Sequence, residues 1–280
     1  MNPSDNRPIG FFDSGVGGLS VLNAARLVLP GENLIYLGDT ARVPYGTKSP
    51  LSITRYAEQA LKALLRYDIK ALVVACNTAS AVALDSLQSS YPALQITGVV
   101  APGAEAAVKV TRSGKIGVIA TESTVNNQAY QKAILSLLPD ANVKSAACSL
   151  FVALAEEGWH EGELVEAIVK RSLSGLFDHY CSGADYPDTL VLGCTHFPAL
   201  KSAIARVVGE KVSLVDSAVI TASVLSKQLT ERGLLNSGSR GCVRFLVTDG
   251  PERFARVARH FYSETVEAEQ VELIDIQHFV

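Results

Sequence analysis

Short apolar runs alternate with longer amphipathic stretches along the whole chain, and this alternation predicts strands and helices in turn. The apolar runs predict strands at 8–12, 33–37, 71–75, 95–99, 115–120, 143–147, 189–192, 212–215 and 243–247. The amphipathic stretches predict helices that include 52–66, 124–138, 162–180, 217–232 and 251–261. Continuous apolar strands separated by helices are typical of parallel sheets that are covered on both faces. The pattern therefore predicts an α/β fold.

Two parts of the chain follow the same plan, in which an apolar strand leads to a cysteine, a threonine and a helix. Ile9 precedes Cys76 by 67 residues, and Ile116 precedes Cys194 by 78. We interpret this as an internal duplication whose copies have diverged in sequence, giving two similar α/β units that each contribute one cysteine. Proline and glycine interrupt the pattern at 99–103, which is where we expect the boundary between the units.

Composition narrows the class of protein. A chain of 280 residues that is 48% hydrophobic and 19% charged can form two packed domains. Its 25 basic and 28 acidic residues leave a net charge of −3, which gives no electrostatic reason to expect a nucleic-acid partner. The sequence also has no signal-peptide pattern and no apolar run near the ~20 residues of a membrane span. We therefore expect a cytoplasmic protein with no membrane partner.

The glycine-rich run after the first predicted strand has several interpretations. A dinucleotide loop is one, with Asp39 after the second strand as the acid that would bind a ribose. However, the order Gly15-x-Gly17-x-x-Ser20 departs from that fingerprint, and no Gly-Lys-Ser/Thr follows as in a phosphate-binding P-loop. The glycines also suit a tight turn into a helix whose N-terminal amides could bind a carboxylate.

The five cysteines are an odd number and widely scattered, a pattern typical of reduced thiols rather than of a disulfide framework. A lone cysteine usually serves as a small buried apolar residue, and we interpret Cys148, Cys181 and Cys242 in this way. Cys76 and Cys194 differ, because polar and hydroxyl-bearing residues flank them at strand ends. In parallel α/β folds ligands bind at the carboxyl ends of the strands.

Several kinds of chemistry could use these two cysteines. Zinc binding by Cys194 and His196 lacks the paired spacing of a zinc site, so we expect no metal. A hydrolase with Cys76 as nucleophile and His196 as base would leave Cys194 without a role. Two opposed thiols suit the inversion of a carbon acid, which needs a base on one face and an acid on the other. Asp13 and His196 are then candidate proton partners for the thiols.

Five runs taken together resemble glutamate racemase, of the aspartate/glutamate racemase family: IGFFDSGVGGLSV, YLGDTARVPYG, VVACNTASA, VIATESTV and LVLGCTHFPAL. The resemblance implies two α/β domains with the site between them, formed by residues 1–99 plus 209–280 and by 100–208. It also implies interconversion of L- and D-glutamate without pyridoxal phosphate or any other cofactor, which supplies D-glutamate for peptidoglycan. We expect a homodimer.

The resemblance assigns roles to individual residues. Cys76 would take the α-proton of D-glutamate with help from Asp13. Cys194 would take that of L-glutamate with help from His196 and Glu156. Glutamate itself would be held by Asp13, Ser14, Tyr45, Gly46, Asn77, Thr78, Thr121 and Thr195.

Overall fold

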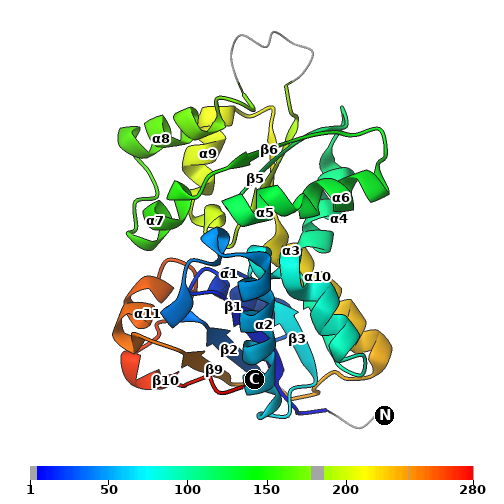
Figure 1. Ribbon diagram of the computed structural model, residues 1–280, viewed down its shortest axis with the longest axis vertical. Helices are drawn as coiled ribbons and strands as arrows, with labels where there is room; N and C mark the ends of the chain where they lie inside the picture. The colour runs from blue at the N-terminus through cyan, green and yellow to red at the C-terminus, as the bar shows by residue number, and fades with distance from the viewer. Residues whose placement is uncertain (1–4, 178–185, 239, 280) are drawn as a thin grey trace.

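The computed structural model describes residues 5–177, 186–238 and 240–279, which form two parallel sheets flanked by helices (Figure 1). The first sheet has the strand order β10 (Val271–Leu273), β9 (Val243–Val247), β2 (Leu34–Gly38), β1 (Ile9–Asp13), β3 (Ala71–Val74) and β4 (Gln95–Gly98). The second has the order β6 (Asn142–Ala147), β5 (Lys115–Ala120), β7 (Thr189–Gly193) and β8 (Ser213–Asp216). The predicted α/β class is confirmed.

Helices cover both faces of each sheet. They are α1 (Leu19–Val28), α2 (Pro50–Leu65), α3 (Asn77–Ser90), α4 (Val100–Val110), α5 (Glu122–Asn127), α6 (Ala129–Leu137), α7 (Leu150–Glu156), α8 (Glu163–Leu173), α9 (Lys201–Val208), α10 (Ser217–Arg232) and α11 (Pro251–Ala258). Short 3-10 turns are η1 (Thr40–Arg42), η2 (Tyr45–Thr47), η3 (Phe197–Leu200) and η4 (Ala268–Gln270). No helix in the described part of the chain is both long and apolar enough to cross a bilayer.

The predicted strands are all present to within one or two residues, but two predicted helices differ from the structure and one strand was missed. The helix predicted at 124–138 is two helices, because Gln128 has a left-handed backbone with φ 59° between α5 and α6. The helix predicted at 162–180 ends at Leu173, and its last three positions lie outside the described residues. The short strand β10 was not predicted.

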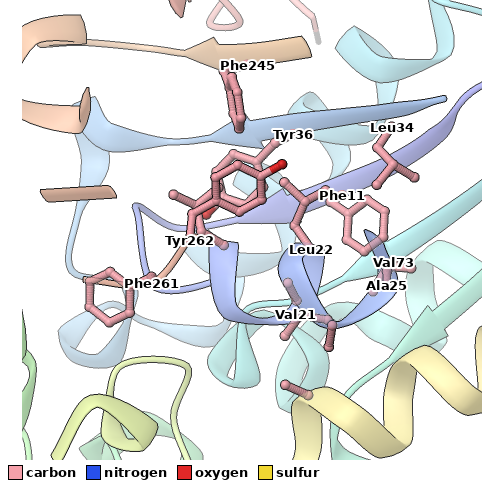
Figure 2. Packing of buried hydrophobic residues seen from close by; sticks show 14 of the residues in the cluster. Phe11, Val21, Leu22, Ala25, Leu34, Tyr36, Val73, Phe245, Phe261 and Tyr262 are labelled. Atoms are coloured by element: carbon pink, nitrogen blue, oxygen red, sulfur yellow. The ribbon is translucent and has the colours of Figure 1, made fainter. Parts of the chain in front are cut away.

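The cores follow from the alternation of side chains along the buried strands. Phe11 and Phe12 are neighbours in β1 and point to opposite faces, so they belong to different clusters. On the Phe11 face, Tyr36 and Phe245 belong to the same cluster as Val21 of the helix α1 (Figure 2). The second sheet is covered in the same way by two clusters. Strands buried on both faces explain why the strands read as continuous apolar runs.

The two sheets share one topology. In each, the first strand in sequence lies between the second and the third, and the fourth follows the third: β2-β1-β3-β4 and β6-β5-β7-β8. Cys76 follows β3 and Cys194 follows β7, so both cysteines follow the third strand of their unit. This shared order supports the interpretation of an internal duplication. It also puts a topological switch point beside each cysteine, the place where ligands bind in open α/β sheets.

The chain crosses between the sheets twice, where β4 leads into α4 and where β8 leads into α10. The first crossing, at 99–100, lies where the boundary was expected. The second crossing comes after β8 (Ser213–Asp216), which pairs with β7 in the second sheet. The expected boundary at 209 would instead assign β8 to the first domain. We therefore propose a first domain of residues 1–99 plus 217–280 and a second of 100–216.

Candidate active site

A cavity of about 330 Å³ lies between the two domains, at the carboxyl ends of the central strands. Almost all of the expected site residues line it: Ser14, Tyr45, Gly46, Cys76, Asn77, Thr78, Thr121, Glu156, Cys194, Thr195 and His196. Asp13 is the exception and lies behind the cavity wall. Both cysteines therefore face one space, each presented by a different sheet.

Cys76 is positioned by the start of α3, where it is the residue that caps the helix. Its thiol donates a hydrogen bond to Ser14 Oγ at 3.5 Å, and the backbone N–H of Ala79 donates to Cys76 Sγ at 3.5 Å. Burial and the nearby carboxyl of Asp13 raise the pKa of Cys76 to about 12, although these two hydrogen bonds oppose the shift. A charge on Cys194 also raises the pKa of Cys76, as expected of two sulfurs that share a cavity. At neutral pH Cys76 is therefore a thiol that can donate a proton.

Asp13 is fully buried at the end of β1, and its Oδ2 accepts hydrogen bonds from Gly15 N at 3.0 Å and Tyr36 OH at 3.3 Å. Its Oδ1 has no hydrogen-bond partner among the described residues. Burial raises the pKa of Asp13, against the opposing effects of a charged His196 and of the hydrogen bonds. The position suits an indirect effect on the Cys76 thiol. The expected direct contact of Asp13 with substrate is not favoured, because Asp13 does not line the cavity.

Cys194 lies at the end of β7 and belongs to a line of three polar groups. His196 Nδ1 is 3.8 Å from Cys194 Sγ, and His196 Nε2 is 3.1 Å from Glu156 Oε1. Burial alone would lower the pKa of His196, but its hydrogen bonds to Cys194 and Glu156 outweigh burial and raise the pKa to about 10. For Glu156, burial is likewise outweighed by the hydrogen bond and charge of His196, so its pKa is lowered. A proton can therefore move between His196 and the Cys194 sulfur.

Neutral polar side chains also line the cavity. The hydroxyls of Thr78 and Thr121 are 2.9 Å apart, although the two residues come from different domains. Asn77 Oδ1 accepts a hydrogen bond from Tyr130 OH at 2.6 Å, while Asn77 Nδ2 has no partner in the described chain. Such groups can bind a carboxylate without placing another charge beside the thiols. Tyr130 was not foreseen, because its role depends on the fold around Asn77.

Tyr45 lines the cavity, and a carboxylate of its own domain holds its hydroxyl. Its hydroxyl donates to the carboxylate of Asp39, which also accepts from Arg42 Nε at 2.7 Å and from Thr248 Oγ1 at 2.9 Å. Asp39 is fully buried by these contacts and holds the loop that carries Gly46. It is therefore not free to bind a ribose.

The glycine-rich run brings the first domain against the second. A Cβ added at Gly17 would lie 2.5 Å from both His196 Nδ1 and Thr195 Oγ1, and one at Gly46 would lie 2.6 Å from Thr121 Cβ. These glycines allow the domains to approach each other closely around the cavity. A dinucleotide would need that same space over the loop, so the geometry does not favour a dinucleotide site.

A cysteine hydrolase and a zinc site also fit the geometry poorly. Both ring nitrogens of His196 face Cys194 and Glu156, whereas a hydrolase with Cys76 as nucleophile would need His196 to face Cys76. Among the described residues, no group of three or more His, Cys, Asp or Glu side chains is arranged to hold a metal ion.

Three other cysteines were interpreted as small buried residues, and the structure confirms this for only one of them. Cys148 is buried, as expected, and burial raises its pKa to about 12. The interpretation of Cys242 as a buried residue was wrong, because it is exposed and its thiol contacts Asn33 Oδ1 at 3.3 Å. Cys181 lies outside the described residues.

Arg253 is a site residue that the sequence did not indicate. It lies in the first turn of α11, lines the cavity, and places its Nη2 2.8 Å from Glu156 Oε2. Arg253 follows β9 after a short loop. The residues directly after each strand were considered as site candidates, and a slightly longer stretch would have included Arg253. Val152 on α7 also lines the cavity and was not foreseen.

Two cysteines face one cavity from opposed sheets, with a carboxyl group near one and a histidine–glutamate pair near the other. Such a site has the groups that an enzyme needs to move protons at a small ligand. Comparison with known proteins agrees, because residues 20–225 match the family described as Asp/Glu/Hydantoin racemase. The chain belongs to this racemase family.

Several of its relatives are glutamate racemases. The protein from Geobacter metallireducens is 48% identical over 94% of this chain and 98% of its own. A crystal structure from Francisella tularensis, in complex with D-glutamate, has a TM-score of 0.89 and 38% identity over 98% of this chain and 99% of that one. A structure from Thermus thermophilus, in complex with β-chloro-D-alanine, has a TM-score of 0.86 and 39% identity over 99% and 100%. The two-domain fold expected from the resemblance is confirmed.

Proposed function

We propose that the protein interconverts L- and D-glutamate by two-base chemistry, with Cys76 and Cys194 on opposite faces of the α-carbon. The observation that carries this proposal is the placement of both sulfurs in one cavity by equivalent strands of two similar domains. The substrate assignment is supported by the relatives, which are glutamate racemases over nearly their whole length. The D-glutamate bound to the Francisella tularensis enzyme is consistent with it.

The chemistry uses one sulfur on each face of the α-carbon. For L-glutamate, the Cys194 thiolate removes the α-proton, and the Cys76 thiol delivers its own proton to the opposite face. The roles are exchanged in the reverse direction, because the same intermediate is reached from the other side. His196 and Glu156 handle protons at Cys194, and Asp13 acts on Cys76 from behind the wall. Neutral donors such as Asn77 and Thr78 bind the carboxylates of the substrate.

The proposal includes the setting of the reaction. No cofactor or metal takes part, since the two thiols supply both base and acid. The enzyme works in the cytoplasm as a homodimer, and its D-glutamate is used for peptidoglycan in cell wall biogenesis.

The direct test is circular dichroism of solutions that contain L-glutamate or D-glutamate alone. Protein that has been dialysed and treated with a chelator should bring either solution to zero ellipticity. A strict requirement for pyridoxal phosphate or for a metal would contradict the proposal. Aspartate should react about 100-fold more slowly, because its shorter side chain misplaces the reacting carbon by ~1 Å or more.

Isotope transfer tests the division of labour between the thiols. L-glutamate supplied in heavy water should give D-glutamate that carries one α-deuterium, because Cys76 exchanges with solvent before it protonates the carbon. The L-glutamate that remains early in the reaction should carry little deuterium. A single base that serves both faces would instead return original hydrogen to the product.

A further inference from the structure

Glu156 is held from two sides by groups of different domains. It ends α7 in the second domain, and its Oε1 lies 3.1 Å from His196 Nε2 of the same domain. Its other oxygen, Oε2, lies 2.8 Å from Nη2 of Arg253, which belongs to α11 and packs with the first sheet. The carboxylate therefore bridges a residue beside Cys194 and a residue of the opposite domain.

The contact between α7 and α11 lies away from both chain crossings. The helices α4 and α10, which begin at the crossings, lie on the right of Figure 1, while α7 and α11 lie on the left. Apolar packing supports this contact, since Ala155 of α7 is buried in the same cluster as Phe254 and Phe261. The ring of Phe261 also meets that of His196 edge-on, with centroids 5.2 Å apart. A motion that separated the domains at this side would break the bond between Arg253 and Glu156.

The ion pair is poorly placed to add much stability. The side chain of Arg253 is 57% exposed, while that of Glu156 is 16% exposed. Exposed pairs gain little, because water screens them and the long side chain loses freedom. The geometric effect is larger, since an arginine on one oxygen fixes the direction of the other oxygen toward His196.

We propose that Arg253 is a positioning residue for the Cys194 side of the reaction: it holds Glu156 toward His196 when the two domains are closed. The proposal rests on the proposed function. Cys76 differs, because among the described residues the groups that bond its sulfur, Ser14 and Ala79, belong to its own domain. Domain closure would therefore position the groups beside Cys194 but not the groups beside Cys76.

Rates of racemisation cannot show that the two thiols depend differently on Arg253. The enantiomers of glutamate have equal free energy, so any variant must change kcat/KM equally in both directions. Elimination from the L- and D-forms of 3-chloroglutamate can reveal it, because each form needs one deprotonation only. The thiolate takes the α-proton, the electrons of the C–H bond form a carbon–carbon double bond, and chloride leaves. The enamine product then hydrolyses to 2-oxoglutarate and ammonium.

The experiment compares R253Q and R253K with R256Q, which removes an exposed arginine from the same helix. In R253Q, kcat for chloride release from the L-form should fall about tenfold with little change in KM, since Glu156 loses its orientation. Release from the D-form should stay unchanged, as should both reactions in R256Q. R253K keeps the positive charge and should retain most of the activity toward the L-form.

Three results would overturn the inference. They are normal elimination from the L-form by R253Q, an equal loss for both forms, and a rise in KM without a fall in kcat. The last result would make Arg253 a substrate-binding residue. Failure of the unmodified protein to racemise glutamate would instead contradict the proposed function, so the two failures are distinguishable.

Discussion

At the scale of single residues, the two cysteines that line the cavity have unlike surroundings. Cys76 lies near the buried carboxyl of Asp13, and its pKa is raised to about 12 by burial and that carboxyl. Cys194 lies beside His196, whose pKa is raised to about 10 by its bonds to Cys194 and Glu156 against the effect of burial. At neutral pH Cys76 is therefore protonated and His196 is charged.

Serine substitutions test the roles of the two thiols one at a time. C76S and C194S should each lose racemisation, because a hydroxyl is a far weaker acid than a thiol. Each variant keeps one thiol, so C76S should still release chloride from the L-form of 3-chloroglutamate and C194S from the D-form. C148S, at a buried packing cysteine, is the control and should stay active. If both variants preferred the same enantiomer, the assignment of faces would be wrong.

The charged state of His196 predicts a pH dependence of stability. Its pKa is about 6.5 in an unfolded chain and about 10 in the folded protein, because bonds to Cys194 and Glu156 outweigh burial. The pair therefore stabilises the fold fully below about pH 6.5, and this contribution is lost as the pH rises toward 10. Urea unfolding should show a larger advantage of the unmodified protein over H196Q at pH 6 than at pH 10. An advantage that grows with pH would contradict the charged state.

At the scale of elements, the loop between β1 and α1 has a role that its glycines did not reveal. The pattern is typical of a loop that binds a ligand, but Gly17 touches Thr195 and His196 of the other domain. The loop therefore sets how closely the first domain approaches the Cys194 side.

G17A tests this role of the loop. A methyl group at Gly17 would lie 2.5 Å from Thr195 Oγ1 and His196 Nδ1, so these side chains must move. We expect kcat/KM for racemisation to fall by about 10- to 100-fold, which is the effect of a displacement near 1 Å at a reacting group. G175A is the matched control, because within the described chain nothing lies within 4 Å of a Cβ at Gly175. Equal activity of the two variants would show that the approach of the loop is not needed.

At the scale of the whole molecule, a buried ion pair holds the C-terminal segment on the first domain. Lys70 Nζ lies 2.6 Å from Glu32 Oε2, with side chains that are 0% and 2% exposed. Lys70 also donates to the backbone oxygen of Leu234, and Glu32 Oε1 accepts from the backbone N–H of Asn236. These bonds connect the start of β3 with the chain that returns after α10.

K70M should destabilise the protein by about 3–5 kcal/mol, because it leaves Glu32 buried without its counter-charge. The double variant K70M/E32L should recover much of this loss, since an apolar pair needs no counter-charge. Urea unfolding followed by circular dichroism measures both, with K109M as a control at an exposed lysine. A loss in K70M no larger than in K109M would mean that the pair does not hold the segment.

The local sequence pattern was enough to predict the strands and many of the residues that line the cavity. The central strands β1, β2, β3, β5 and β7 were predictable because they are apolar runs buried on both faces, and Cys76 and Cys194 were found because each follows such a run. The motif residues such as Asn77 and Thr121 do line the cavity. The strand β10 escaped prediction because it has three residues, of which Glu272 and Leu273 are exposed.

Only the tertiary structure decided which distant segments meet. Arg253 and Glu156 are separated by 97 residues, and their bond depends on how α11 and α7 face each other. The same holds for β8, which pairs with β7 rather than joining the first sheet, and for Asp13, which lies behind the cavity rather than in it. Periodicity records which side of an element is buried, but not which other element covers it. That choice is made by packing between parts of the chain that no local pattern connects.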